Sequence, residues 1–523
     1  MKKFRNKLIQ GTLLLTIAGF VTRLIGFAYR IFLADVLGTK LLGIYQLVFP
    51  VYGICFTIYG AGIQTAISQL IASNVETSSQ KARKDLAILK WGLLTSLSLS
   101  LSLTTIVFTF AEPIATHLLL ESSCSPYLKI LALLFPFCGT AACINGYFYG
   151  KKEAKVPAVT QIIEQLVRVT SVVLLCILLS VTGETGCKFA LLGLVFGEAA
   201  SCFYNCYQLY LAIHKNIKKG TDTKLRPFSK DNLLTPTTIQ HNKIAATLIF
   251  LAFTLTITKL VISILHSVEA VFIPAALRKF GCSPQDALSI YGILSGIALP
   301  FILFPSTITN SFAVMLLPAI AQAQAERSDE KIRNYVTLSS KYSLFIGYLF
   351  TCIFLLFGKE LGQSIFHSID AGNYIFVLSW LCPFLYLSTT LTSIINGLGK
   401  TQLTFLITVV SLLVKIYFLI FLVPRYGIQA YLVGSLLSQI TMTLLEIIYL
   451  RKYIHWSFLR FFLLPGICLV TLGFSLKKMY QLLPVAHNDR YSLFFIAGIC
   501  LIISLGYLII LEKLKCINRK DIM

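Results

Sequence analysis

Two arginines lie inside the first hydrophobic segment of the chain, at Arg23 and Arg30, seven residues apart. In a helix this spacing is close to two full turns, so both side chains share one face. A second segment repeats the pattern with Lys259 and His266, where Thr-Lys-Leu-Val matches Thr-Arg-Leu-Ile. A charge inside a bilayer costs about 3 kcal/mol or more and normally faces a wet interior. The two matched cationic faces therefore predict a polar cavity, between two related halves, that receives an anion.

A structural explanation of these four residues is also open. Arg30 can snorkel to the outer interface and pair with Asp35, and Glu269 can neutralise Lys259 or His266. Repetition in both halves favours function, because snorkelling needs no symmetry. An arginine fork matches phosphate oxygens and a lysine adds a point charge, so the cavity would suit a pyrophosphate or another polyanion.

Further ionisable residues lie in the predicted spans. Glu164 and Arg168 are spaced i, i+4, which predicts an intrahelical ion pair and leaves a place in the cavity as the alternative. Glu198 and Lys415 have no visible partner in sequence, and either could line the cavity.

The composition predicts an all-α integral membrane protein. Of 523 residues, 56% are hydrophobic and only 13% are charged, with a mean hydropathy of +0.78. A soluble protein of this length could not hide so much apolar surface. Segments of about 20 apolar residues span a bilayer as helices, and we count roughly fourteen of them. The predicted spans are 12–33, 43–72, 86–110, 127–149, 157–181, 188–212, 246–273, 287–317, 335–357, 372–396, 402–423, 428–450, 459–480 and 491–511.

The net charge of +23 is explained by topology rather than by nucleic acid. With the N-terminus in the cytoplasm, the inner segments hold about 27 Lys and Arg and the outer ones about nine, the positive-inside pattern. Both termini are therefore expected in the cytoplasm, and the positive loops are expected to meet anionic lipids of the cell membrane. Arg23 lies deep in the first apolar run, which favours a retained helix over a cleaved signal peptide.

Three matches indicate an internal duplication. The pair Arg23/Arg30 matches Lys259/His266, Asn145-Gly-Tyr matches Asn396-Gly-Leu, and Leu166-Val-Arg168 matches Leu413-Val-Lys415. Six spans separate the halves, which predicts two parallel repeats. The predicted division is residues 1–212 as the N-lobe with helices 1–6, 213–245 as a cytoplasmic linker, 246–452 as the C-lobe with helices 7–12, and 453–523 as helices 13–14 with a cytoplasmic tail.

Enzyme chemistry is not expected. The chain has no Gly-rich phosphate loop ending in Lys-Ser/Thr, no His-Glu-x-x-His and no Cys-x-x-Cys. The predicted outer loops are short and lack a carboxylate pair. We therefore expect no cofactor and no metal site.

Several motifs resemble a known family. They are Thr22-Arg-Leu-Ile-Gly-Phe-Ala-Tyr-Arg30, Leu42-Gly-Ile-Tyr-Gln46, Leu288-Ser-Ile-Tyr-Gly292 and Leu316-Leu-Pro-Ala-Ile-Ala321. They resemble the stage V sporulation protein B branch of the polysaccharide biosynthesis proteins. That branch belongs to the multidrug/oligosaccharidyl-lipid/polysaccharide (MOP) exporter superfamily and is similar to the lipid II flippases.

The resemblance implies two six-helix lobes around a central cavity that opens alternately to each side. It implies an undecaprenyl-pyrophosphate-linked sugar as cargo, in peptidoglycan synthesis for the spore cortex, with cell-wall synthesis proteins as possible partners. First-helix arginines serve transport in those flippases, and this role carries over to Arg23 and, with a spacing that differs by one residue, to Arg30. The chain departs from the flippases in its seventh and eleventh spans, which hold Glu269 as their only acid, so a sodium site built there is not expected.

Two other functions stay open at this point. A cation-coupled multidrug exporter would share the architecture, but cationic drugs call for acidic walls, and the first helix offers arginines. A teichoic or capsular lipid-linked oligosaccharide would present the same pyrophosphate-lipid end as lipid II.

Overall fold

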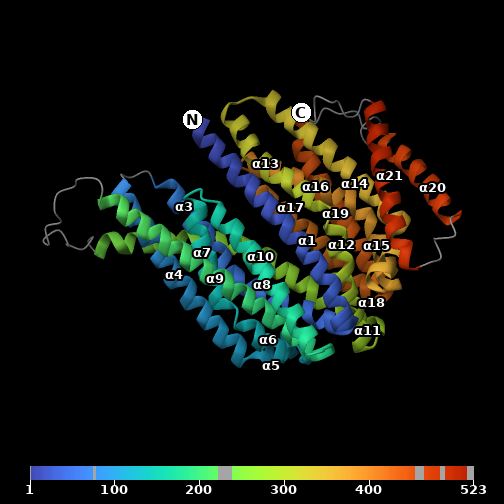
Figure 1. Cartoon of the computed structure of the whole chain (residues 1–523), viewed down its shortest axis with the longest axis horizontal. Coiled ribbons are helices and arrows are strands. Elements are labelled where there is room, and N and C mark those ends of the chain that lie inside the picture. Colours follow the sequence, from blue (N-terminus) through green and yellow to red (C-terminus); the bar gives the residue numbers. More distant parts are fainter. Residues whose placement is uncertain (1, 75–77, 222–237, 454–463, 483–488, 515–523) are drawn as a thin grey trace. The chain divides into compact units, whose positions relative to one another are not determined.

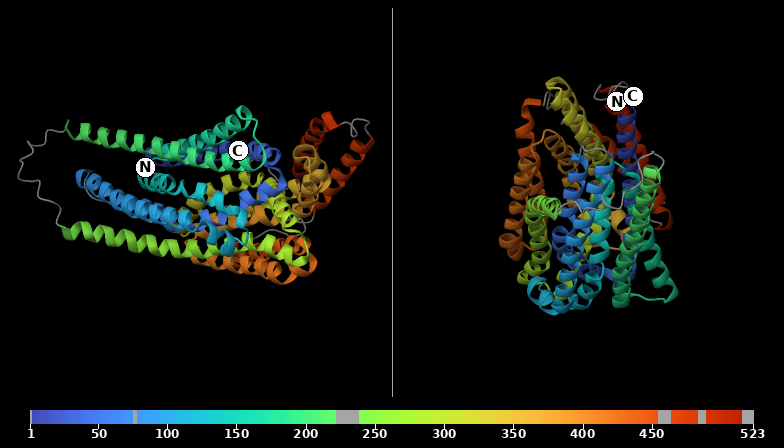
Figure 2. Two further views of the ribbon diagram at one scale, coloured as in Figure 1. Left: turned by 90° about the horizontal axis from the view of Figure 1, so that it is seen from below. Right: turned by 90° about the vertical axis from the view of Figure 1, so that its left-hand side faces the viewer.

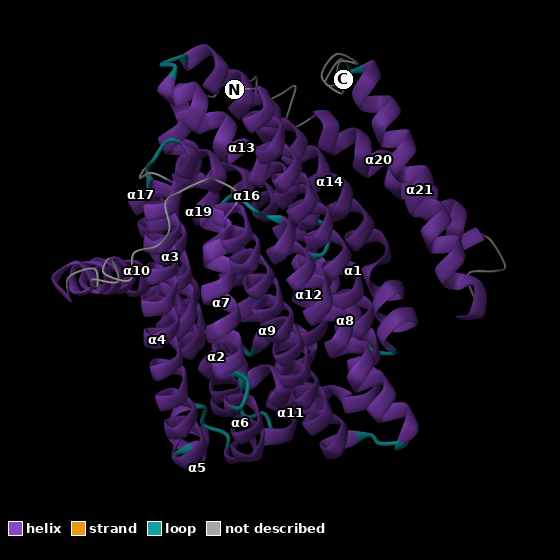
Figure 3. Ribbon diagram, turned by 60° about the vertical axis from the view of Figure 1, so that its left-hand side comes forward, coloured by secondary structure: helices purple, strands orange, loops and turns teal. Residues whose placement is uncertain are grey.

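The computed structural model describes residues 2–74, 78–221, 238–453, 464–482 and 489–514. Helices make up nearly all of these residues, and no strand occurs among them (Figure 3). The predicted all-α fold is therefore confirmed. Part of the predicted cytoplasmic linker, residues 222–237, lies outside the described residues, and α9 continues as a helix to Thr221.

The helices follow one another as labelled in Figure 1. They are α1 (Lys2–Leu47), α2 (Phe49–Phe56), η1 (Thr57–Ala61), α3 (Gly62–Ser73), α4 (Ser78–Thr109), α5 (Ala111–Pro113), η2 (Ile114–Leu118), η3 (Ser122–Cys124), α6 (Ser125–Ala132), α7 (Phe135–Gly150), α8 (Lys155–Leu178), α9 (Gly183–Thr221), α10 (Thr238–Phe280), α11 (Pro284–Gly292), η5 (Ile293–Ala298), α12 (Leu299–Leu303), α13 (Ser306–Ala325), α14 (Asp329–Phe366), α15 (Ile369–Leu378), η6 (Ser379–Leu381), α16 (Cys382–Gly397), α17 (Thr401–Tyr417), η7 (Phe418–Leu422), α18 (Val423–Tyr426), α19 (Ile428–Leu450), η8 (Arg451–Tyr453), α20 (Leu464–Leu482) and α21 (Asp489–Lys513).

Many of these helices are long and apolar enough to cross a membrane. Among the described residues there are 11 such segments, or 12 if the bent pair Ser122–Ala132 and Phe135–Gly150 forms one span. The segment Leu14–Ser73 has 60 residues, about 90 Å of helix at 1.5 Å per residue, which is enough for two crossings. It covers two predicted spans, and Gly38, with φ 70° and ψ 171°, breaks its helical path between them. The chain is a multi-pass membrane protein, and the count of fourteen stays a prediction.

The described helices group into two compact units. Unit 1 contains Met1–Tyr29 and Ile44–Val271, and unit 2 contains Arg30–Gly43 and Phe272–Met523. Each unit therefore includes a piece of chain from the other predicted lobe. Most of α10, the predicted first helix of the C-lobe, packs in unit 1, while residues 30–43, near the end of α1, pack in unit 2 against α11. The predicted lobe boundaries stay a prediction.

Both units interrupt corresponding helices in the same way. A π-helical turn, η1, separates α2 from α3 in unit 1, and a second, η5, separates α11 from α12 in unit 2. A later helix of each unit, α7 in unit 1 and α16 in unit 2, has 16 residues and carries a proline in its first turn, at Pro136 and Pro383. Proline is tolerated there because its missing N–H would have no intrahelical partner.

Two close helix contacts repeat from unit to unit. A Cβ on Gly150 of α7 would meet the Ser68 carbonyl oxygen at 2.9 Å and Ile71 Cβ at 2.7 Å. A Cβ on Gly397 of α16 would meet the Leu317 carbonyl oxygen at 3.0 Å and Ile320 Cβ at 2.9 Å.

One turn earlier the same correspondence holds. Gly146 faces the Gln64 carbonyl oxygen, while the Ser393 hydroxyl donates to the Ala313 carbonyl oxygen. The structure therefore aligns Gly150 with Gly397. The sequence match between Asn145 and Asn396 is wrong by one helical turn, because the Asn-Gly dipeptide recurs without its packing partners.

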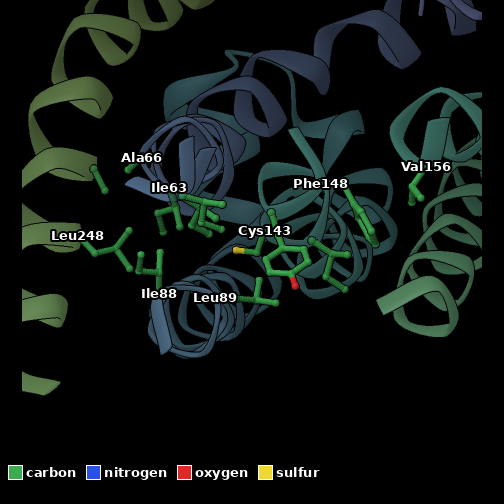
Figure 4. Close-up of a cluster of buried hydrophobic side chains, with 13 residues drawn as sticks. Ile63, Ala66, Ile88, Leu89, Cys143, Phe148, Val156 and Leu248 are labelled. Carbon is green, nitrogen blue, oxygen red and sulfur yellow. The ribbon is translucent and has the colours of Figure 1, made fainter. Parts of the chain in front are cut away.

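Each unit has its own apolar core. In unit 1 a cluster joins α3, α4, α7 and α10 through residues such as Ile63, Leu89, Cys143, Phe148 and Leu248 (Figure 4). In unit 2 a comparable cluster joins α13, α14, α16 and η8. A further cluster packs α20 and α21 on α14. Large side chains that interdigitate in this way hold the helix faces in a fixed register.

Candidate functional site

Lys259 is anchored inside unit 1 by oxygens that carry no charge. Its Nζ lies 2.8 Å from the Ala61 carbonyl oxygen and 2.8 Å from Thr65 Oγ1. Ala61 is the last residue of the π-helical turn η1, where the helix widens. Of the two partners that the sequence offered for Glu269, Lys259 is not the one in contact with it, because both hydrogen bonds of Lys259 go to neutral acceptors. The Lys259 side chain is half-buried.

Further along α10, after Lys259, the helix contacts the first turn of α2. The Ser267 hydroxyl donates to the Pro50 carbonyl oxygen at 3.3 Å. His266, one position earlier, is exposed, and its Nδ1 lies 3.5 Å from Glu269 Oε2, so the pairing of His266 with Glu269 is confirmed. The partners of Lys259 and His266 therefore differ. Lys259 binds to oxygens at the end of the π-helical turn, whereas His266 contacts an acid.

The two arginines of α1 fall in different units. Arg23 is exposed and belongs to unit 1, three residues before Gly26, where a Cβ would lie 3.2 Å from Gln165 Nε2 of α8. Arg30 is half-buried and belongs to unit 2. Its pairing with Asp35, and the place of both arginines in one cavity, stay predictions.

A polar group on α8 faces α1 and α9 within unit 1. Arg168 Nη1 lies 3.5 Å from Glu164 Oε1, which confirms the predicted i, i+4 ion pair, and Arg168 also donates to the Gln165 side chain. Gly197 of α9 lets the two helices approach, since a Cβ there would lie 2.8 Å from the Glu164 carbonyl oxygen. Gln165 was missed in the sequence, although its position three residues before Arg168 marks the same helix face.

Glu198 adds a second carboxyl to this group. It follows Gly197 on α9 and is flanked by Glu164, Arg168 and the Cys138 thiol of α7. Arg168 forms its ion pair with Glu164 and is also close enough to Glu198 to act on it electrostatically. The sequence showed no partner for Glu198, because its neighbours come from two other helices.

Lys415 occupies the matching place in unit 2. The Ser438 hydroxyl of α19 donates to the Ser411 carbonyl oxygen at 2.6 Å, just as Gly197 faces Glu164 in unit 1. Lys415 and Arg168 each lie four residues further along, so the sequence match between them agrees with the packing. Lys415 Nζ lies 5.4 Å from the centre of the Tyr431 ring, a cation–π contact.

Family models match most of the chain. The polysaccharide biosynthesis protein family matches residues 8–324, and the MatE family matches residues 276–421. The first match covers more than half of the chain and includes Arg23, Arg30, Lys259 and His266.

Individual relatives agree over nearly the full length. Stage V sporulation protein B of Bacillus subtilis (strain 168) is 24% identical over 99% of this chain and 97% of its own. The lipid II flippase MurJ of the same organism is 20% identical over 87% of this chain and 84% of its own. A solved structure of lipid II flippase MurJ in an inward closed conformation superposes with a TM-score of 0.69 at 14% identity, over 96% of this chain and 99% of that one. The chain belongs to the polysaccharide biosynthesis protein family of the MOP exporter superfamily, and is a membrane flippase or exporter.

Proposed function

We propose that the protein carries an anionic lipid-linked saccharide across the cell membrane, with an undecaprenyl-pyrophosphate end and a lipid II-like headgroup. One observation carries this proposal: on a membrane-spanning helix, Lys259 Nζ donates to the Ala61 carbonyl oxygen and to Thr65 Oγ1, and neither of these oxygens carries a charge. A fixed cation in a membrane interior attracts an anion. Arg23, in the same unit, would add a planar fork for phosphate oxygens.

The wider cationic site is part of the proposal. Arg30 and His266 would complete it, in a central cavity that opens alternately to each side. The net charge of the cavity walls would be set by further ionisable residues, namely Lys415, Arg168, Glu164, Glu198 and Glu269. No cofactor enters this scheme, because moving a lipid headgroup breaks no bond, and the matched flippases are transporters rather than enzymes.

The name of the sporulation relative favours a cell-wall role. We propose that the cargo serves peptidoglycan of the spore cortex, where cell-wall synthesis proteins consume it. Both termini would lie in the cytoplasm. In support, the beginning of α4 lies at the same end of unit 1 as the end of α9 and the beginning of α10 (Figure 2), and the lysine-rich segments predicted as cytoplasmic begin there.

Reconstitution in liposomes tests the proposal directly. Purified protein should translocate fluorescent lipid II, and Lys259→Gln should reduce the rate by about tenfold or more while Lys259→Arg retains part of it. Lys331→Gln, at an exposed lysine, is the matched control and should transport normally. Unchanged transport by Lys259→Gln would refute the role of this charge.

The MatE match keeps a multidrug exporter as the second candidate. Overexpression would then raise resistance to cationic drugs, and lipid II would not move. Translocation of teichoic or capsular precursors in preference to lipid II would keep the mechanism and change the cargo.

A further inference from the structure

Glu446 is a buried acid on α19 that the sequence analysis passed over. Its side chain is 1% exposed within unit 2. Thr392 of α16 donates to its Oε1 at 2.5 Å, and Ser388, one turn earlier, offers a second hydroxyl. The other oxygen, Oε2, is fully buried and has no hydrogen-bond partner among the described residues.

Among the described residues, no cationic side chain of the packed elements forms an ion pair with Glu446. Three elements packed on α19, namely α16, η6 and η7, contain no charged residue. Lys415 of α17 contacts Tyr431, which precedes Glu446 by about 22 Å of helix. The remaining charged residues of the packed elements are Asp370 in the first turn of α15, Arg425 before α19, and Arg451 and Lys452 after it.

The other titratable groups on the facing elements are thiols and phenols. They are Cys382 and Tyr386 of α16, Tyr374 of α15, Tyr417 of α17, Tyr426 of α18, and Tyr453 of η8.

An ionised carboxyl in such a place would be costly. Burying an unpaired charge in an apolar interior costs several kcal/mol, and the group instead takes up a neutralising ion. A proton needs only the free oxygen, Oε2. A hard metal cation needs about six or more oxygen ligands, and this pocket supplies one carboxyl and two hydroxyls.

The corresponding position in unit 1 is neutral. Asn205 lies eight residues after Gly197, as Glu446 lies eight residues after Ser438, and both glycine and serine make the matching contact to the preceding helix. Asn205 is also fully buried and accepts from Thr160 at 2.7 Å. The corresponding position in unit 1 is therefore filled by a buried amide, with its hydroxyl partner on α8 rather than on α7, so the fold does not require an acid here.

We propose that Glu446 is an exchangeable proton-binding site that couples transport to the proton gradient. The carboxyl is neutral in this structure, with the proton on Oε2. When the carboxyl gains access to water, the O–H bond breaks, the proton passes to water and the carboxylate keeps the electron pair. Rebinding of a proton closes the cycle. The coupling step rests on the proposed transport function, whereas the proton site itself does not.

Infrared difference spectroscopy on the detergent-solubilised full-length protein tests the site without any cargo. In sodium-free choline buffer, the wild type should show a protonated-carboxyl C=O band that Glu446→Gln removes. Thr392→Val should keep the band and shift its frequency, because the hydroxyl that bonds to Oε1 is gone. Glu326→Gln, at an exposed acid, should leave the band unchanged. If Glu446→Gln does not fold, Thr392→Val alone decides.

Two spectroscopic results would overturn the proposal. In the first, the spectra of Thr392→Val and the wild type are identical, so that no protonated-carboxyl band can be assigned to Glu446. The other is loss of the band when sodium chloride replaces choline chloride at the same pH, which would assign the site to sodium.

A transport arm separates this inference from the proposed function. In liposomes, Glu446→Gln should lose proton-driven accumulation of labelled lipid II by at least about tenfold and keep equilibrium exchange. If Glu446→Gln loses proton-driven accumulation and equilibrium exchange to the same extent, the coupling role is overturned. Absence of lipid II transport by the wild type, with the infrared band present, would refute the cargo and leave the proton site intact.

Discussion

Lys259 Nζ and the Ala61 carbonyl oxygen lie 2.8 Å apart, which places a lysine of α10 at the end of the π-helical turn in the second helix. The Ala61 carbonyl oxygen also accepts from the Thr65 hydroxyl at 2.8 Å, so the lysine, the hydroxyl and the carbonyl form one connected hydrogen-bonded group. The contact therefore has two consequences, one for the stability of unit 1 and one for its charge.

Replacing Lys259 should separate these two consequences. Lys259→Met keeps the chain length but leaves the Ala61 carbonyl without its charged donor, and should cost about 1–3 kcal/mol of stability. Lys259→Arg should recover most of it. Thermal unfolding of the purified protein, followed by tryptophan fluorescence, measures the difference. An unaltered melting temperature in Lys259→Met would show that the bond contributes only to function.

The close contact at Gly397 gives a prediction for packing. Gly397→Val would press its side chain into Ile320 and the Leu317 carbonyl oxygen, and should cost about 1–3 kcal/mol by overpacking. Gly150→Val should cost a similar amount against Ile71, because the two positions correspond.

Gly19→Ala supplies the control for this pair. Nothing lies within 4 Å of a Cβ at Gly19, so the substitution should be neutral or slightly stabilising through helix propensity. Equal losses at all three glycines would show that the correspondence between the units has no energetic weight.

The sequence predicted features that depend on local spacing. Apolar runs identified the helices, and the i, i+4 and i, i+3 intervals identified Glu164 with Arg168 and His266 with Glu269. These predictions succeeded because the backbone geometry of one helix fixes both partners.

Contacts between helices were not predictable in the same way. The bonds of Lys259 go to a carbonyl and a hydroxyl, groups that occur everywhere in the chain. Glu446 went unnoticed because its partners, Thr392 and Ser388, lie on a different helix. The packing of Gly150, rather than the repeated Asn-Gly, reveals the alignment of the two units.

The ion pair of Arg168 with Glu164 predicts coupling between residues of α8. Arg168→Gln alone should destabilise unit 1, since it leaves the carboxyls of Glu164 and Glu198 without their cation. The double variant Arg168→Gln with Glu164→Gln should recover part of the loss. A double-mutant cycle on unfolding should give a coupling energy of about 1–3 kcal/mol. A value near zero would mean that the pair, although 3.5 Å apart, is screened.

A surface turn provides a prediction about pH. Between α13 and α14, hydrogen bonds from Lys331 and then Gln322 hold the pKa of Glu326 below its ordinary value. A carboxyl whose pKa is lowered on folding contributes stability above its unfolded pKa and loses that stability as the pH falls through the folded pKa.

Hydrogen exchange in this turn should therefore be slower in the wild type than in Glu326→Gln at neutral pH. The difference should begin to shrink near the ordinary pKa of 4.5 and vanish once the pH has fallen through the lower pKa of the folded state. Glu153→Gln, in another connection, should leave exchange in this turn unchanged at both pH values. A difference between wild type and Glu326→Gln that persists in acid would show that the carboxylate charge is not its cause, because the protonated side chain and the amide are then both neutral.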